Sequence, residues 1–406
     1  MTASGRRHPR RPRAFGTTVF AEMSELAART GAINLGQGFP DQDGPDSVRE
    51  AAVAALRAGR GNQYPPVAGV PELRAAVADH QRARYGLAFD PEREVLVTAG
   101  ATEAIAATLL ALVSPGDEVV VLDPAYDAYA AAIALAGGVR VSVPLRPERG
   151  AFRLDPAELR AAVTPRTRLL LVNSPHNPTG TVLTRAELTG IAELAVEHDL
   201  LVVTDEVYEH LVYGVEHLPL AGWPGMRERT VTVGSAGKTF SFTGWKIGWL
   251  TAPADLLGAV LAVKQYLTYV PAGPLQYAVA KALRLPPAYF DGLRAELADR
   301  RELLVAGLER AGFGVFRPAG TYFVTADIRP LGERDGVAFC RALPDRAGVV
   351  AVPSAVFYQR PELGAPFVRF AFCKRPAVLR AAADRLASLG PAGGRPAAAD
   401  SPLSTV

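Results

Sequence analysis

The chain has 406 residues, of which 49% are apolar and 21% charged, the composition of an ordinary globular protein. Its formal net charge of +3 depends on five arginines within the first thirteen residues. Without those five, 39 of the 44 basic residues remain against 41 acidic ones. The body of the chain therefore lacks the excess of basic residues that nucleic-acid binding requires. No run of eighteen apolar residues occurs, so no membrane-spanning helix is predicted.

Both ends of the chain have the composition of disordered segments. Residues 1–16 predict a disordered basic leader, with a nucleic-acid or membrane arm as the alternative. The prolines of this leader break any amphipathic helix, and the lack of an apolar stretch argues against a signal peptide. Residues 390–406, rich in Gly, Pro, Ala and Ser, predict a disordered tail.

Between the ends, short apolar runs rich in β-branched residues predict strands. Seven such runs occur in the first part of the chain: Glu94–Thr98, Glu118–Leu122, Arg140–Leu145, Arg168–Asn173, Leu200–Thr204, Thr230–Val233 and Ile247–Thr251. Helical patterns fit between them, at Thr102–Val113, Ala125–Leu135 and Arg185–His198. The last of these follows Thr184 and carries Glu187, the pattern of a capping box. The alternation predicts an α/β domain over residues 45–290, with a mostly parallel sheet covered on both faces.

A different pattern begins after Tyr289. A long charged helix is expected at Phe290–Ala311, and short strands at Thr321–Ile328, Val349–Val352 and Phe367–Phe372. Further helices are expected at Gly336–Leu343 and Ala377–Leu389. We predict a smaller α+β domain at residues 291–389, joined by an N-terminal segment at residues 17–44.

Cysteine and histidine usage narrows the chemistry. Cys340 and Cys373 do not form a CxxC pattern, and two cysteines in a chain of this size suggest a reduced, cytoplasmic protein. The six histidines are scattered, with neither an HExxH motif nor a paired-ligand spacing, so no metal site is predicted.

Lysine is scarce in this chain, and its distribution is informative. Only five lysines occur, none of them in the first 237 residues, whereas arginine fills nearly every other basic position. Two of the five, Lys238 and Lys246, lie in the glycine-rich segment GSAGKTFSFTGWKIGW. Because only lysine supplies a titratable primary amine, this placement indicates a chemical role.

The Gly-Lys-Thr at 237–239 resembles the end of a phosphate-binding P-loop. That motif requires a glycine five residues before Gly237, and this position is Thr232. The strand LLVVTDE, which mimics a Walker B strand, also precedes the motif rather than following it. Spacing and order therefore favour a nucleophilic Lys238, whose pKa a nearby cation such as Lys246 would lower.

Other segments carry polar residues at strand ends. Asp205 ends an apolar strand, where a structural salt bridge is the alternative to a ligand-binding carboxylate. NSPHNPTG, at 173–180, holds Asn177 in a loop with two prolines, where asparagine as a simple turn residue is the alternative. Gly100, Ala101 and Thr102 begin a helix whose free N–H groups suit a phosphate, although many strand–helix junctions look alike. Arg369, among apolar residues in FVRFAF, requires an anion or an internal acid.

Four motifs in one order carry a resemblance to a known family. INLGQGFPD, NSPHNPTG, TDEVYEHL and SAGKTFSFTGWKIGW resemble the class I/II aminotransferases of fold type I, from about Thr17 to about Leu386. The chain is most similar to the kynurenine/glutamine/methionine-type enzymes and to actinobacterial N-succinyldiaminopimelate aminotransferases. The resemblance implies a seven-stranded, mostly parallel sheet in a large domain that binds pyridoxal 5'-phosphate.

The resemblance also implies how the cofactor is held. Lys238 corresponds to the Schiff-base lysine of the family. Lys246 and Ser235 would hold the cofactor phosphate, together with backbone groups of Ala101 and Thr102.

The remaining cofactor contacts follow from the same motifs. Asp205 would pair with the pyridine nitrogen and Tyr126, in DPAYDAY, would stack on the ring. Asn177 and Tyr208 would hydrogen-bond the ring oxygen.

Substrate and partner contacts are implied as well. Arg369 would bind the substrate carboxylate, with Gly38 and Asn177 beside it, and Phe20 would line the substrate pocket. Tyr64, in NQYPP, would reach the phosphate of the cofactor in the partner subunit, which implies a homodimer with its active site at the subunit interface.

Three positions depart from the pattern of the kynurenine-type relatives. Tyr126 replaces a frequent phenylalanine, Phe20 a frequent tryptophan and His176 an asparagine. These changes leave the cofactor chemistry intact but leave the amino donor open among aromatic and sulfur amino acids, glutamine, kynurenine and N-succinyl-diaminopimelate. The expected activity is ping-pong transfer of an amino group to a 2-oxo acid such as 2-oxoglutarate, with a β-lyase on the same scaffold as the alternative.

Overall fold

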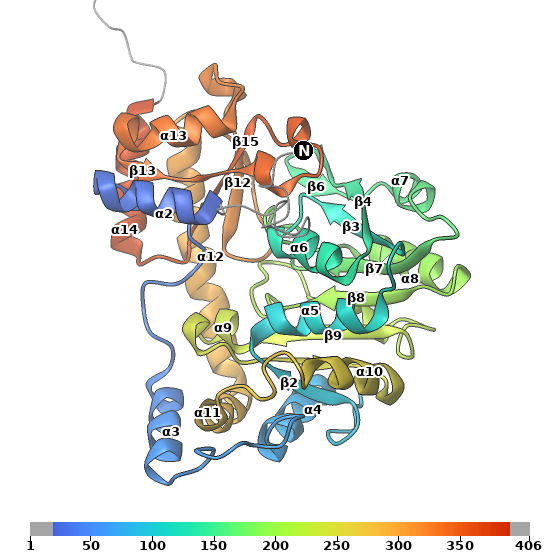
Figure 1. Cartoon of the computed structure of the whole chain (residues 1–406). Helices are drawn as coiled ribbons and strands as arrows, with labels where there is room; N and C mark the ends of the chain where they lie inside the picture. The colour runs from blue at the N-terminus through green and yellow to red at the C-terminus, as the bar shows by residue number, and fades with distance from the viewer. Residues whose placement is uncertain (1–18, 390–406) are drawn as a thin grey trace, which may run out of the picture.

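The computed structural model describes residues 19–389. The predictions of a disordered leader at 1–16 and a disordered tail at 390–406 lie outside the described residues. Within the described range, the chain builds one seven-stranded sheet, one four-stranded sheet and two small two-stranded pairings (Figure 1). No helix in this part of the chain is long and apolar enough to cross a bilayer.

The seven-stranded sheet contains every strand predicted before residue 252, and each boundary agrees within two residues. The strands are β2 (Val95–Thr98), β3 (Glu118–Asp123), β4 (Val139–Pro144), β7 (Thr167–Asn173), β8 (Leu201–Asp205), β9 (Thr230–Ser235) and β10 (Gly248–Thr251). Their spatial order is β2-β10-β9-β8-β7-β3-β4. Only β10 runs antiparallel to its neighbours in this sheet. The predicted mostly parallel sheet is therefore confirmed.

Helices bury both faces of this sheet because successive side chains of a strand point to opposite sides. Val119 and Val121 pack in one apolar cluster, whereas Val120 and Leu122 pack in another. The first cluster includes helices α5 (Gly100–Leu112), α6 (Asp127–Ala136) and α10 (Ala254–Lys264). The second includes α8 (Arg185–Glu197). A third cluster packs β2 against helices α3 (Asp46–Arg57), α4 (Pro71–Tyr85) and α11 (Gly273–Leu283).

The smaller sheet is antiparallel and comes from the C-terminal part of the chain. It orders β11 (Gly314–Phe316), β12 (Phe323–Asp327), β15 (Phe367–Ala371) and β14 (Val352–Pro353) as β11-β12-β15-β14. Helices α13 (Gly336–Ala347) and α14 (Pro376–Leu386) pack with it, as does α12 (Pro287–Arg310). The predicted α+β part of the fold is thus confirmed. The one strand expected at Val349–Val352 is instead two short strands, Val349–Val350 and Val352–Pro353, which pair with different partners.

The N-terminal segment joins this smaller part, as predicted. Helix α2 (Val19–Thr30) packs beside α13, and β1 (Ile33–Asn34) pairs in parallel with β13 (Val349–Val350) (Figure 1). Helix α12 runs through the predicted boundary at residue 290, so the division into 17–44, 45–290 and 291–389 remains a prediction.

The capping box predicted at the start of α8 is present. Thr184 Oγ1 accepts a hydrogen bond from the Glu187 backbone N–H at 3.2 Å, and the Thr184 N–H donates to Glu187 Oε2 at 2.7 Å. Glu187 Oε1 also accepts from the backbone of Leu154 at 3.0 Å. The box therefore fixes the start of a helix that covers one face of the large sheet.

We predict that Thr184→Ala lowers the free energy of unfolding by about 1 kcal/mol, because a helix N–H loses its acceptor. The shift of the unfolding midpoint in urea measures this loss. Thr184→Ser keeps the hydroxyl and is the matched control. Equal midpoints for the Ala and Ser variants would contradict the prediction.

Candidate active site

A cavity of about 350 Å³ lies at the carboxyl ends of β7, β8 and β9, where parallel sheets place their ligand groups. Thirteen of the fourteen site residues predicted from the sequence line it. They are Phe20, Gly38, Gly100, Ala101, Thr102, Tyr126, Asn177, Asp205, Tyr208, Ser235, Lys238, Lys246 and Arg369. Asp205 and Ser235 lie at the ends of β8 and β9, and Gly100, Ala101 and Thr102 begin α5, which directly follows β2. Phe20 comes from α2 and Arg369 from β15 of the smaller sheet.

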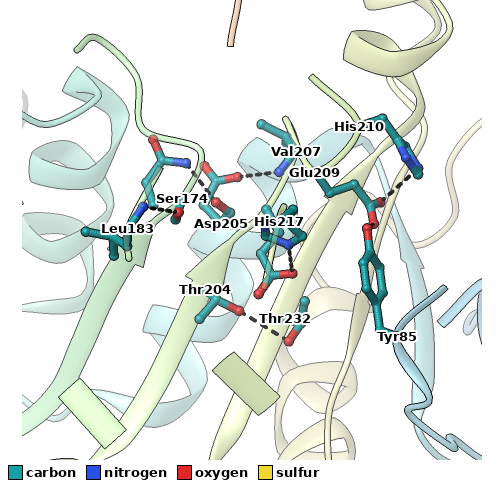
Figure 2. A network of polar contacts seen from close by, with 12 residues as sticks. Tyr85, Ser174, Leu183, Thr204, Asp205, Val207, Glu209, His210, His217 and Thr232 are labelled. Carbon is teal, nitrogen blue, oxygen red and sulfur yellow. Dashed lines mark hydrogen bonds and ion pairs between the residues drawn. The ribbon is translucent and has the colours of Figure 1, made fainter. Parts of the chain in front are cut away.

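Asp205 is the buried carboxylate of this cavity. Its Oδ2 accepts a hydrogen bond from Tyr129 at 2.5 Å, and its Oδ1 accepts a longer one from the Val207 N–H at 3.3 Å (Figure 2 shows the second contact). Burial raises the pKa of Asp205, while the Tyr129 hydrogen bond lowers it. No ion pair within 4 Å neutralises Asp205 among residues 19–389, so the carboxylate is suited to a cationic ligand atom.

Lys238 lies in the single-turn helix α9 (Ala236–Thr239), which directly follows β9. Burial lowers the pKa of its amine; Asp205 opposes this effect, whereas Lys246 and Arg369 add to it. Within the described residues, Nζ forms neither a hydrogen bond nor an ion pair, and it lies 5.9 Å from the centre of the Tyr208 ring. A half-buried amine with a lowered pKa has the properties of a nucleophile or a base.

The start of α5 forms a cradle of the size and charge of a phosphate group. Gly100 has a φ of +75°, and a Cβ placed there would lie 3.1 Å from Lys246 Nζ. Lys246 Nζ also lies 3.5 Å from Thr102 Oγ1, and no side chain caps the first N–H groups of the helix. A Cβ on Gly248 would lie 2.7 Å from the Ala101 nitrogen. Glycines, free N–H groups and an ammonium thus converge on one spot, the pattern of an anion site.

Arg369 is 1% exposed and has no acidic partner within 4 Å in the described part of the chain. Its Nη1 donates to Asn177 Oδ1 at 2.8 Å and its Nη2 to the Gly36 carbonyl at 3.0 Å, whereas Nε lacks a partner among residues 19–389. The guanidinium stacks on Phe323, with 3.9 Å between its central carbon and the ring centre. Burial lowers its pKa to about 10. A buried guanidinium with an unused N–H suits a carboxylate ligand.

The rings and glycines around these charges shape the cavity. Burial raises the pKa of Tyr208, so its phenol is protonated and can donate a hydrogen bond. Burial also raises the pKa of Tyr126, to about 12. Gly38 is required by packing, because a Cβ there would lie 2.4 Å from the Phe323 ring. Phe20 lies over Arg369, at 5.2 Å from its ring centre to the guanidinium carbon.

One predicted site residue, Tyr64, does not line this cavity, and neither does His176, which departs from the family pattern. Tyr64 is 80% exposed and contacts the edge of the Tyr269 ring, with 5.3 Å between ring centres. His176, the departure in the NSPHNPTG loop, is buried; its Nδ1 lies 2.8 Å from Thr179 Oγ1, and burial lowers its pKa to about 3. It therefore acts as a neutral part of the loop.

Sequence reasoning missed several lining residues, among them Gln37, Tyr129, Asn173 and Phe323. A signal existed for Tyr129, which stands three residues after Tyr126 and so shares its helix face. Gln37 and Asn173 stand inside motifs that were singled out for other residues. Phe323 carried no signal, because its place depends on how the smaller sheet meets the larger one.

A buried polar cluster lies behind the segment that carries Asp205. Glu209 Oε2 accepts a hydrogen bond from Tyr85 at 2.6 Å, and Glu209 Oε1 lies 3.7 Å from His210 Nε2 (Figure 2). His80 Nε2 lies 3.3 Å from Glu209 Oε2. Although burial raises the pKa of Glu209, the two histidines and Tyr85 lower it below its usual range. His80, Glu209 and His210 offer ligand-type atoms within 4.8 Å of one another. Glu209 already accepts a hydrogen bond from Tyr85 and contacts His80, which accounts for the cluster without a metal ion. That the chain has no metal site remains a prediction.

Comparison with known proteins places the chain in a family. The model for "Aminotransferase class I and II" matches residues 30–386. The chain is 54% identical over 388 residues to a probable N-succinyldiaminopimelate aminotransferase of Mycobacterium tuberculosis, covering 93% of this chain and 98% of that protein. It is 41% identical over 375 residues to the methionine aminotransferase of Escherichia coli, covering 92% and 96%.

Solved structures agree with these matches. The structure of N-succinyldiaminopimelate aminotransferase from Mycobacterium tuberculosis superposes with a TM-score of 0.92 at 54% identity, covering 94% of this chain and all of that one. The methionine aminotransferase of Escherichia coli superposes with a TM-score of 0.90 at 40% identity, covering 94% and 99%. The chain therefore belongs to the class I and II aminotransferases, a family of transaminases that depend on pyridoxal phosphate.

Proposed function

We propose that this aminotransferase takes its amino group from N-succinyl-LL-diaminopimelate and passes it to a 2-oxo acid such as 2-oxoglutarate. The observation that carries this proposal is the 54% identity, over nearly the full length of both chains, to a relative that bears this activity in its name. The relatives reported above are all named as aminotransferases, which favours amino transfer over the β-lyase alternative.

A second donor class has a specific observation in its favour. Three phenylalanine rings, Phe20, Phe323 and Phe357, surround the Arg369 guanidinium at 3.9 to 5.2 Å. An apolar wall of this kind suits a methionine or aromatic side chain. Methionine is also the substrate named for the Escherichia coli relative.

The residues of the cavity fit pyridoxal phosphate. The cradle of Gly100, Lys246 and Thr102 suits its phosphate, with Ser235 nearby, and the buried Asp205 suits the protonated ring nitrogen. Asn177 and Tyr208 would hold the ring oxygen and Tyr126 would lie on the ring face. When bound, the cofactor supplies the electron sink that makes the substrate Cα–H bond acidic.

The protein's own groups supply orientation and proton transfer. Arg369 offers its free Nε–H edge to the substrate carboxylate, while Asn177 and the Gly36 carbonyl keep the guanidinium in place. Lys238 Nζ, held with a lowered pKa, would take the proton from the substrate Cα and pass it to the C4′ carbon of the cofactor. Positioned proton transfer of this kind is worth about 10²–10⁴ in rate.

We further propose that the enzyme is a cytoplasmic homodimer. Cys340 and Cys373 are both free and buried, which fits a reducing compartment. Tyr64, Tyr266 and Tyr269 expose large rings near one another in the chain's surface loops, and a second copy would cover them. In such a dimer Tyr64 would donate to the partner subunit's cofactor phosphate.

The donor is tested by a half-reaction panel without any 2-oxo acid. We predict that N-succinyl-LL-diaminopimelate removes the visible absorbance of the bound cofactor at least ten times more efficiently than methionine, phenylalanine, kynurenine or glutamine. Stopped-flow absorbance gives the second-order rate constant for each donor. If methionine or an aromatic amino acid gave the largest rate constant, the proposed donor would be wrong and the second donor class would replace it.

Lys238→Ala is predicted to abolish turnover, with a loss of at least 10²–10⁴ in rate, because the amine that moves the proton is gone. Borohydride should no longer fix the cofactor to the protein. Lys281→Ala, at an exposed position, is the matched control and should keep both properties. Full activity and fixation in the Lys238 variant would refute the assignment.

Tyr64→Phe is predicted to weaken cofactor binding about fivefold, the effect of one lost hydrogen bond of about 1 kcal/mol, without changing the dimer. Equilibrium dialysis and sedimentation velocity measure the two properties. Tyr266→Phe, at another exposed ring, serves as the control. A monomeric enzyme with full cofactor affinity would rule out both the dimer and the role of Tyr64.

A further inference from the structure

Tyr129 makes the shortest contact to the central carboxylate of the site. It lies on α6, is 2% exposed, and donates its phenolic hydrogen to Asp205 Oδ2 at 2.5 Å. The other carboxylate oxygen accepts only the long contact from the Val207 N–H at 3.3 Å. The phenol is thus the principal hydrogen-bond donor to Asp205 within the described residues.

A hydrogen bond of this kind has two physical effects. A donor to a carboxylate stabilises the ionised form, and it also fixes the rotation of the carboxylate plane, which is otherwise a soft torsion. Both effects matter here because Asp205 is buried, and burial raises its pKa. Without the phenol, little in the cavity would hold the group charged before a ligand arrives.

The other titratable groups around Asp205 do not replace the phenol. Lys238 favours the ionised form, but only as a charge at a distance, and Glu206 disfavours it. Burial, with a smaller contribution from the charge of Asp205, raises the pKa values of Tyr126 and Tyr208, and neither donates a hydrogen bond to Asp205.

Helix geometry explains why this tyrosine can reach the carboxylate. Tyr126 and Tyr129 are three residues apart and share one face of the helical turn, with 5.6 Å between ring centres in an edge-to-face arrangement. Tyr129 is buried in the apolar cluster between the sheet and helices α5 and α6. Its hydroxyl therefore approaches Asp205 from the core, while the ring of Tyr126 borders the cavity.

We propose that Tyr129 is a positioning residue of the transamination reaction, which holds Asp205 ionised and oriented toward the ring nitrogen of the cofactor. The proposal rests on the proposed role of Asp205. It adds a member to the site that none of the four sequence motifs assigned.

The test is a double-mutant cycle read by cofactor binding rather than by turnover. We expect Tyr129→Phe to raise the dissociation constant for pyridoxal phosphate tenfold or more in the wild-type background. In the Asp205→Asn background the same change should alter it less than twofold, because the acceptor is already neutral. Tyr213→Phe removes a buried phenol that donates to the Thr321 carbonyl at 2.6 Å, and it should leave the constant unchanged.

The pH dependence of binding provides a readout that packing alone would not move. Loss of the hydrogen bond raises the pKa of Asp205, so the carboxylate is neutralised at a higher pH as the solution is acidified. Cofactor affinity of Tyr129→Phe should therefore begin to fall at a higher pH than in the wild type or in Tyr213→Phe. An unchanged profile would overturn the proposal.

The remaining outcomes are also decisive. An equal loss of affinity in both backgrounds of the cycle would mean that Tyr129 acts by packing, and no loss in either would mean that it has no role. If Asp205→Asn alone leaves cofactor affinity intact, the proposed role of Asp205 fails instead. Should Tyr129→Phe fold poorly, Tyr129→His keeps a ring and an N–H donor; affinity within threefold of wild type supports the proposal, and a larger loss overturns it.

Discussion

Buried charge without enough internal partners is the constraint on which this structure depends. Asp205, Lys238 and Arg369 line one cavity, and none has an oppositely charged group within 4 Å among the described residues. Asp205 and Arg369 are buried, and Lys238 is half-buried. Burying such groups costs several kcal/mol each unless a ligand supplies the missing partner. A cofactor with a cationic ring nitrogen and a substrate with a carboxylate complete what the protein leaves open.

The two sheets divide this task between them. The large sheet ends its parallel strands at the cavity, so Asn173 and Asp205 stand side by side in register on neighbouring strands. The smaller sheet brings Arg369 on β15, and this residue reaches across to Asn177 and Gly36. Under the proposed function, the residues around the large sheet would hold the cofactor and Arg369 of the smaller sheet would bind the substrate carboxylate. The packing between the two sheets would then set the distance between cofactor and carboxylate.

The polar groups behind the cavity hold the segment that carries Asp205 in place. Tyr129 holds the end of β8 from the core side through Asp205. On the far side, His217 lies 2.8 Å from Glu206, and Tyr85 donates a hydrogen bond to Glu209 (Figure 2 shows Tyr85, Glu209 and His217). Tyr85 comes from α4 and Tyr129 from α6, whereas His217 lies in the loop that follows β8. Together they make a short segment rigid, which a site with a buried carboxylate requires.

Much of the fold could be predicted from local patterns. Apolar runs gave all seven strands of the large sheet within two residues, and Thr184 with Glu187 gave a helix start, since both signals depend on near neighbours. Thirteen of fourteen site residues also proved to share one cavity, because motifs at strand ends converge when the strands are parallel. Tyr129 and Phe323 were missed because their contacts join separate elements, and spacing in the chain carries no record of such contacts.

The sequence by itself determined the α/β organisation, the distinct positions of Lys238 and Lys246, and the identity of the groups available for chemistry. The tertiary structure alone decided which groups meet. It set Lys246 Nζ 3.5 Å from Thr102 Oγ1, put Tyr129 on Asp205, and brought His80 to Glu209. The physical reason is range: periodicity and capping act over a few residues, whereas these contacts join residues 76 to 144 positions apart and exist only once the sheet is packed.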